Sequence, residues 1–134
     1  KKMIETFTYQ ISSTKSVNEI AANIGEACNQ FKFSLLHTYD YFEILQTKGF
    51  PIQRKVNIYE ICQAKMASKM LTSNPEFSLF MPCKIVLYED GGKTIISTMN
   101  MGIMLKAVED NKELYKEATD MFTAIKELMN FLIK

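Results

Sequence analysis

The last quarter of the chain carries a single apolar stripe with helical spacing, which runs for about six turns. It follows Asp110-Asn111-Lys112-Glu113, and its members are Leu114, Ala118, Met121, Phe122, Ile125, Leu128, Met129 and Leu132. Most of a helix's stability in a protein comes from burying such a face, and nothing else in the 134 residues except a sheet is large enough to cover this one. We therefore predict that the helix lies across a β-sheet.

The remainder of the chain contains the strands for that sheet. Alternation of side chains in residues 3–11 predicts a first strand, and runs at 33–39 and 53–62 predict a second and a third. Asp90-Gly91-Gly92 separates two further strand-like runs, 83–89 and 93–99. A two-glycine turn between such runs is typical of a β-hairpin.

Helical signals lie between these strands. Ser16-Val17-Asn18-Glu19 is a capping box, and it opens a helix whose apolar positions continue to residue 31. Short helices are predicted over 41–48, after Asp40 as N-cap, and over 64–72. The order predicts an α+β fold with one domain over residues 1–134. Its curved, mainly antiparallel sheet would be packed by the capped N-terminal helix and the long C-terminal helix.

The charge and metal-ligand content argue against several classes of function. Sixteen basic and fifteen acidic residues give a net charge of +1, and Arg54 is the single arginine, which argues against nucleic-acid binding. His37 is the one histidine, so one chain cannot build a multi-histidine metal site. The three cysteines are far apart in sequence and form no zinc-ribbon pattern or disulfide framework.

The sequence leaves the cellular compartment open. No apolar run approaches the roughly 20 residues needed for a membrane span, so a soluble protein is expected. The chain starts at Lys1-Lys2 instead of Met, which suggests a processed or trimmed product. Both a cytoplasmic protein and one exported after removal of a signal agree with these features.

The middle of the chain resembles a known family as a unit. The segments that carry the resemblance are residues 33–37 (FSLLH), 56–62 (VNIYEIC) and 74–89, which includes Met81-Pro82-Cys83. They resemble the domain-of-unknown-function family 302, small bacterial and archaeal proteins in which a Pro-Cys pair, usually preceded by Leu, opens a strand before a hairpin. Here Met81 replaces that Leu, a change that conserves volume. The resemblance implies a β-α-β4-α sheet similar to the TATA-binding-protein-like arrangement, usually homodimeric, and no established activity.

Cys83 is the first candidate site residue. A thiol at the mouth of a strand could serve as a persulfide carrier, a redox thiol, or a metal or haem ligand, each of which needs an accessible thiolate. The alternative is a small hydrophobic residue packed at the start of the strand. Cys28 and Cys62 are expected to have only packing roles.

His37 and the methionines complete the candidates. His37 alternates with Leu35 and Tyr39, so we expect its side chain to share their face, as a core residue or as a ligand in a pocket. A symmetric dimer would bring a second His37. Nine methionines, among them Met81 and Met99, are an unusually large number; they could fill an irregular core, line an apolar cavity, or ligate haem iron or Cu(I).

These features lead to one main functional hypothesis and two alternatives. The main hypothesis is a non-enzymatic, homodimeric ligand-binding module with an apolar pocket for haem or another largely apolar cofactor. Its candidate cofactor-binding residues are His37, Met81, Cys83 and Met99, with His37 as the candidate metal ligand. The first alternative is a thiol-based redox or sulfur-carrier protein that acts through Cys83. The second is an assembly domain without a ligand.

Overall fold

The computed structural model of the chain describes residues 7–134, so residues 3–6 of the first predicted strand lie outside the described residues. The five strands form one sheet in the order β1-β5-β4-β3-β2, and every neighbouring pair is antiparallel. Their bounds are β1 Thr8–Ser13, β2 Ser34–Asp40, β3 Val56–Cys62, β4 Cys83–Asp90 and β5 Lys93–Met99. The predicted α+β class and the β-α-β4-α order are confirmed.

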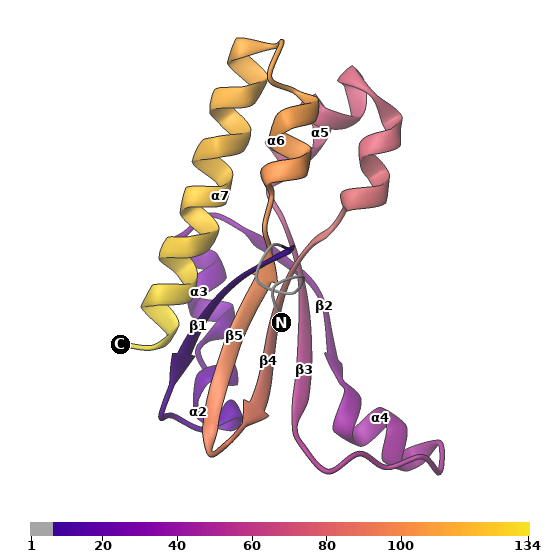
Figure 1. Cartoon of the computed structure of the whole chain (residues 1–134), viewed down its shortest axis with the longest axis vertical. Coiled ribbons are helices and arrows are strands. Elements are labelled where there is room, and N and C mark those ends of the chain that lie inside the picture. The colour runs from indigo at the N-terminus through magenta and orange to yellow at the C-terminus, as the bar shows by residue number, and fades with distance from the viewer. Residues whose placement is uncertain (1–6) are drawn as a thin grey trace.

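The helices lie in three places around this sheet (Figure 1). The segments between β1 and β2 and after β5 supply α2 Val17–Ala21, α3 Ile24–Gln30 and the long α7 Lys112–Leu132. The helices α5 Ala64–Ser73 and α6 Gly102–Ala107 lie beyond one end of the sheet, beside the first half of α7, and the 3₁₀ helix η1 Pro75–Phe80 contacts α5. The last helix, α4 Tyr41–Thr47, projects from the opposite end.

The C-terminal helix buries the stripe that its sequence predicts. All eight predicted apolar positions of α7 are buried, and the exposed positions between them are largely charged or polar. Asn111 is the N-cap, and its side chain accepts a hydrogen bond from the backbone N–H of Leu114. Phe122 meets the ring of Tyr9 on β1 edge to face, with centroids 6.3 Å apart. The helix therefore closes the core over the sheet.

The predicted hairpin is confirmed at its predicted turn. Asp90 pairs with Lys93, so Gly91 and Gly92 form a two-residue loop between β4 and β5. Both glycines have positive φ, at 57° and 80°, as a type I′ turn requires. This turn sets the register that places Leu87 opposite Ile96 in the core.

The helix predicted for residues 17–31 is wrong in one respect, because the structure divides it into α2 and α3. The capping box of Ser16 and Glu19 is present, with both reciprocal hydrogen bonds. The chain leaves helical geometry at Asn23, where φ is −105° and ψ is 1°. Asparagine is unfavourable inside a helix, because its side chain forms hydrogen bonds with the backbone in non-helical conformations. The bend still allows both Ile20 and Ile24 to reach the core.

The sequence analysis missed η1 and α6. No element is predicted between the helix over 64–72 and the strand over 83–89, but Pro75–Phe80 form a 3₁₀ helix that begins at the Asn74 cap. Residues after the hairpin were not assigned, and Gly102–Ala107 form α6. Both are six residues long, too short for a periodic pattern to identify. Both help to build the site.

Candidate functional site

A cavity of about 320 Å³ lies where the sheet meets its upper helices. The end of β3 and the start of β4 form its floor, with Ile61 and Cys83 paired across the two strands. Side chains from α5, η1, α6 and α7 form the walls. It is the volume of a small ligand pocket, at the lower end of the usual range.

The lining of the cavity is apolar and rich in sulfur. Seven of its fifteen lining residues are Cys or Met, although the whole chain has only three Cys and nine Met. They are Cys62, Met66, Met70, Met81, Cys83, Met104 and Met121. Gln63 and Ser78 are the lining residues with other polar side chains, and none of the fifteen is charged. We call this space the sulfur cavity.

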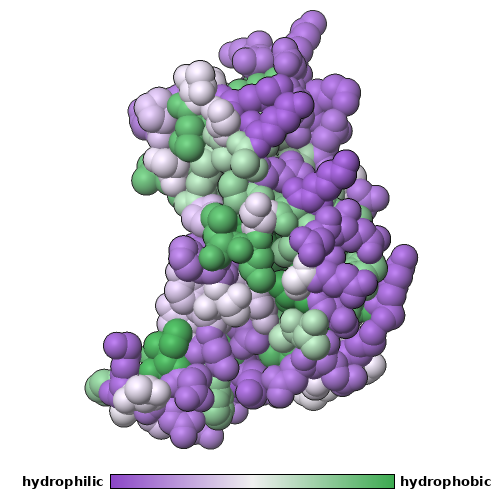
Figure 2. Space-filling model, turned by 180° about the vertical axis from the view of Figure 1, so that it is seen from behind, coloured by the Kyte–Doolittle hydropathy of each residue, from purple (hydrophilic) through white to green (hydrophobic). Residues whose placement is uncertain are grey.

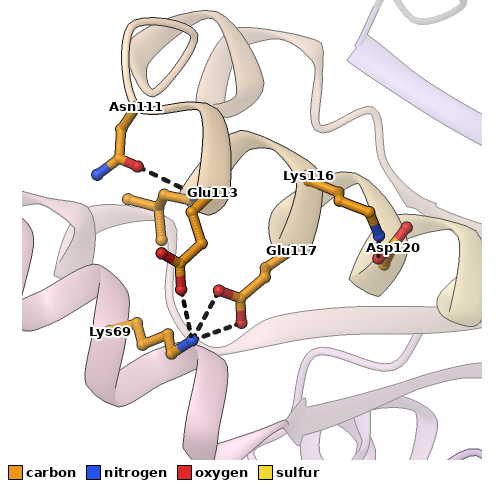
Figure 3. A network of polar contacts seen from close by, with 7 residues as sticks. Lys69, Asn111, Glu113, Lys116, Glu117 and Asp120 are labelled. Atoms are coloured by element: carbon orange, nitrogen blue, oxygen red, sulfur yellow. Dashed lines mark hydrogen bonds and ion pairs between the residues drawn. The ribbon is translucent and has the colours of Figure 1, made fainter.

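An ion-pair network holds the α5 wall against α7 (Figure 3). Lys69 Nζ lies 2.6 and 2.8 Å from the two carboxylate oxygens of Glu117, and 3.5 Å from Glu113 Oε1. The hydrogen bond from Lys69 lowers the pKa of Glu117, and the same bond raises the pKa of Lys69. Because Met66 and Met70 are four residues apart on α5, both are turned into the cavity while Lys69 meets α7.

The mouth of the sulfur cavity is formed by apolar side chains that also reach solvent. Leu36 of β2, Leu71 of α5 and Phe80 of η1 line the cavity and are 46%, 38% and 39% exposed. Leu79, the neighbour of Phe80, is 84% exposed. Figure 2 shows hydrophobic surface at mid-height, where the upper helices join the sheet. The cavity therefore opens through an apolar rim.

Cys83 lies in the floor of the cavity, at the first position of β4, after a cis Met81–Pro82 peptide bond. Burial raises the pKa of its thiol to about 11, and Cys62 adds to the effect. The thiol is therefore protonated at neutral pH, which weighs against a nucleophilic role, because the thiolate is the reactive form. Cys28 lies in the core on α3, where burial also raises its pKa.

Cys62 is a site residue that the sequence analysis missed. It was expected to have only a packing role, and its distance from Cys83 in sequence gives no reason to join them. The β3–β4 register pairs Ile61 with Cys83, and Cys62, the next residue of β3, is also among the residues that line the cavity. The pairing of the third and fourth predicted strands would have placed Cys62 near Cys83, but local sequence patterns do not show which strands pair or in which register.

A second, smaller hollow adjoins the sulfur cavity. Cys83, Met104 and Phe80 line both spaces, and Met99, Met101 and Lys84 are among the other residues of the second. We call it the side hollow. Met99, predicted as a ligand-binding residue, lies here at the end of β5 and is 63% exposed. Of the four predicted cofactor-binding residues, Met81 and Cys83 line the sulfur cavity and Met99 lines the side hollow.

His37 lies elsewhere. The prediction that it shares a face with Leu35 is wrong, because β2 has one extra residue between them: Leu35 pairs with Ile61 but His37 pairs with Glu60. This bulge turns His37 to the face opposite the core, where its side chain is 70% exposed. Tyr39 is on that face too, as predicted, with its ring centroid 6.2 Å from that of His37.

Glu60 joins His37 and Tyr39 into a polar group on this outer face. Tyr39 Oη donates a hydrogen bond of 2.8 Å to Glu60 Oε1, and His37 Nδ1 lies 3.5 Å from the same oxygen. The hydrogen bond to Glu60 raises the pKa of Tyr39. Within residues 7–134, no three His, Cys, Asp or Glu side chains gather closely enough to hold a metal ion.

None of the helices in residues 7–134 is long and apolar enough to cross a membrane. The family model of a domain of unknown function, DUF302, matches residues 9–132. A similar solved structure is the crystal structure of an uncharacterized conserved DUF302 protein from Bacillus stearothermophilus, with 26% identity and a TM-score of 0.80. The match covers 96% of this chain and 98% of that one. No curated protein matches the chain.

Proposed function

The chain belongs to the DUF302 family, and we propose that it is a non-enzymatic, homodimeric module that binds a small, largely apolar molecule in the sulfur cavity. The observation that carries the proposal is the lining: fifteen residues from β2 to α7 enclose about 320 Å³ without a charged side chain. Pockets of this kind gain affinity from apolar contact and orientation from a few polar groups. Gln63 and Ser78 are those groups here.

The size of the cavity favours a slender ligand. Its volume equals that of about ten water-sized groups, which suits a short aliphatic chain or a single ring system. The methionine side chains are unbranched and flexible, so the walls can adjust to ligands of different outline. Haem is far larger than the enclosed space and would extend through the apolar mouth, with sulfur ligands in place of His37. It is the second ligand to test.

The experiment is a calorimetric titration of the purified protein with 1-octanol, a short aliphatic probe, and, separately, a titration with haem. We expect the octanol titration to be saturable, and Ala67→Leu, which enlarges a side chain of the cavity wall, to weaken octanol binding about tenfold. The matched control is Ala64→Leu, the same exchange on an exposed turn of α5. The proposed ligand site is wrong if neither probe binds, or if the Ala67→Leu variant has the same affinity as the parent protein for a probe that does bind. Either result would favour an assembly domain without a ligand.

The dimer that we propose covers the rim of the same cavity. Leu36, Leu71, Leu79 and Phe80 expose a continuous set of large apolar side chains beside the mouth, which is a feature of interaction surfaces. A second copy seated there would remove this surface from water and close the cavities of both subunits. The exposed position of Leu79, outside the cavity lining, allows the dimer to be tested separately from the ligand.

Sedimentation velocity checks this interface. We expect the parent protein to be a dimer at micromolar concentration and Leu79→Lys to be a monomer, because each interface would then bury two unpaired charges. Phe50→Lys is the matched control, since Phe50 is 77% exposed in the loop after α4, at the other end of the molecule. A monomeric parent protein, or a Leu79→Lys dimer, would exclude this interface.

A further inference from the structure

A further pocket adjoins the sulfur cavity between α5 and α7. Its volume is about 210 Å³, and Gln63, Met66 and Met121 line both spaces. The residues that line this pocket but not the sulfur cavity are Lys65, Glu117 and Asp120. We call it the outer pocket. An apolar space therefore lies beside a polar one, an arrangement that suits an amphipathic molecule.

Ion pairs already engage the two acids of the outer pocket (Figure 3). Lys69 Nζ lies 2.6 and 2.8 Å from the carboxylate oxygens of Glu117 and 3.5 Å from Glu113 Oε1. Lys116 Nζ donates a hydrogen bond of 2.9 Å to Asp120 Oδ2. Both acids therefore have a cation beside them before any ligand arrives.

The surroundings of the outer pocket favour a neutral group over an ion of either sign. The charged side chains of its lining and their ion-pair partners among residues 7–134 sum to no net charge; they are Lys65, Lys69, Lys116, Glu113, Glu117 and Asp120. A carboxylate would meet the like charges of Glu117 and Asp120, and an ammonium group would meet that of Lys65. The lining of the sulfur cavity has no charged side chain, so an ion that moved inward would lose its hydration without compensation.

Gln63 is the polar side chain where the two spaces meet. It is the N-cap of α5, and its side-chain amide has no hydrogen-bond partner within residues 7–134. Ser78, the other polar residue of the sulfur cavity, already donates its hydroxyl proton to the carbonyl oxygen of Pro75 at 2.7 Å, so it can only accept. An amide has two N–H donors and one carbonyl acceptor, so Gln63 can bind a hydroxyl, carbonyl or amide group.

We propose that the ligand is a neutral amphipathic molecule, whose apolar part fills the sulfur cavity and whose uncharged polar group forms a hydrogen bond with Gln63 beside the outer pocket. The inference rests on the proposed function and narrows it to one class of ligand. Apolar burial supplies most of the affinity, and it is the same for an alcohol and for an ion of equal chain length. Selectivity comes from the polar end, where an ion would be desolvated without a free counter-charge.

Calorimetric titration of the parent protein at pH 7.5 tests the class of ligand. The three probes have equal chain length: 1-octanol, octanoate and octylammonium. We expect 1-octanol to bind about tenfold more tightly than either ion, or better. If octanoate or octylammonium binds as tightly as 1-octanol, the neutral class is wrong. This comparison needs no variant, so it does not depend on the folding of one.

A substitution at Gln63 tests the hydrogen bond. Gln63→Met keeps a side chain of similar length and removes the amide, so the affinity for 1-octanol should fall about fivefold. Toluene has no hydrogen-bonding group and should bind the variant and the parent protein equally. Gln46→Met is the matched control, because Gln46 is exposed on α4 at the opposite end of the molecule; it should change neither affinity. An unchanged affinity of Gln63→Met for 1-octanol would remove Gln63 from the site.

The two proposals fail in different ways. If neither 1-octanol nor toluene binds the parent protein, the small apolar ligand is excluded, and the proposed function and this inference fall together. If both bind, but an ion binds as tightly as 1-octanol or Gln63→Met has no effect, the apolar pocket stands and only the neutral ligand held by Gln63 is overturned.

Discussion

The two ends of helix α7 pack against different kinds of core. Toward its C-terminus, Ile125, Leu128 and Leu132 share a buried cluster with mainly aliphatic residues of the sheet and of α3, and each of the three is at most 1% exposed. We call this the aliphatic core. Toward its N-terminus, Met121 faces Met66, Met70 and Met104 across the sulfur cavity. Branched side chains have few rotamers and fill space closely, whereas methionine is flexible and adapts to an irregular wall. One helix therefore supports a rigid core and an adaptable cavity.

The largest expected effect is in the aliphatic core. Leu128→Ala removes three buried carbon atoms from a residue that lines neither the sulfur cavity nor the side hollow, and we expect a loss of about 3 kcal/mol in the free energy of unfolding. Chemical denaturation measures it. A loss below about 1 kcal/mol would mean that this region relaxes as easily as the cavity wall, and the contrast between the two ends would be lost.

The second-largest expected effect is a difference in how fast the cysteine thiols of the two regions are alkylated. Because the pKa of Cys83 is about 11, against an ordinary 9.0, its thiolate fraction at pH 8 is about 100-fold below that of an ordinary cysteine. Alkylation of native protein by iodoacetamide should therefore be slow at pH 8 and accelerate as the pH rises toward 11. Mass spectrometry of the labelled peptides measures both rates.

Cys28 provides the comparison within the same experiment. It is 2% exposed in the aliphatic core, so we expect its labelling to require unfolding and to depend on denaturant. Rapid labelling of Cys83 in the native protein at pH 7 would contradict its raised pKa, and would favour the redox or sulfur-carrier alternative.

A smaller effect is expected at the cavity wall. Met70 is as buried as Leu128, but Met70→Leu conserves volume and faces a space that can absorb the change in shape, so the cost should be below about 1.5 kcal/mol. Denaturation curves measured beside those of Leu128→Ala test this. A cost equal to that of Leu128→Ala would show that the cavity wall is packed as tightly as the aliphatic core.

The smallest effect is expected from the ion pair that holds α5 against α7. The lowered pKa of Glu117 means that its contribution is present above the ordinary value of 4.5 and is lost as the pH falls through its folded value. The raised pKa of Lys69 means that its contribution is present below 10.5 and is lost as the pH rises through its folded value. Glu117→Gln should therefore lower Tm slightly between these limits and should not lower it in acid.

Asp120→Asn is the control for that measurement. Asp120 pairs with Lys116 at 2.9 Å on the same helix, but both side chains are largely exposed, so water screens the pair. We expect no measurable change in Tm. A change in Tm equal to that of Glu117→Gln would mean that the ion pair between α5 and α7 stabilises the fold no more than an ordinary surface ion pair does.

Much of the fold was predictable because its signals are local. The capping box at Ser16, the two-glycine turn at Gly91 and the eight-residue stripe of α7 each involve residues a few positions apart, and each is confirmed. The division of α2 from α3 at Asn23 was not predicted, because the apolar stripe continues across the break. Six-residue elements such as η1 and α6 are too short to establish a period.

The candidate site was predictable only in part. The Pro-Cys pair directed attention to Cys83, and the methionine excess indicated an apolar cavity, which is present beside it. Strict alternation predicted that His37 shares the face of Leu35, in the core or in a pocket, and a single extra residue in β2 turns it to the other face. The alternation of side chains predicts which face a residue occupies only when the register of the strand is known. A bulge shifts that register, and it arises from the pairing of two strands and not from the sequence of one.

The sequence by itself determined the elements whose causes lie within a few residues, including the long helix whose apolar stripe implied a sheet beneath it. Only the tertiary structure decided which side chains share a space. Pairing of β3 with β4 places Ile61 opposite Cys83, and the meeting of α5, α6 and α7 gathers methionines far apart in the chain. The physical reason is that local geometry follows from short-range sterics and hydrogen bonds, whereas a cavity is defined by the packing of elements distant in sequence.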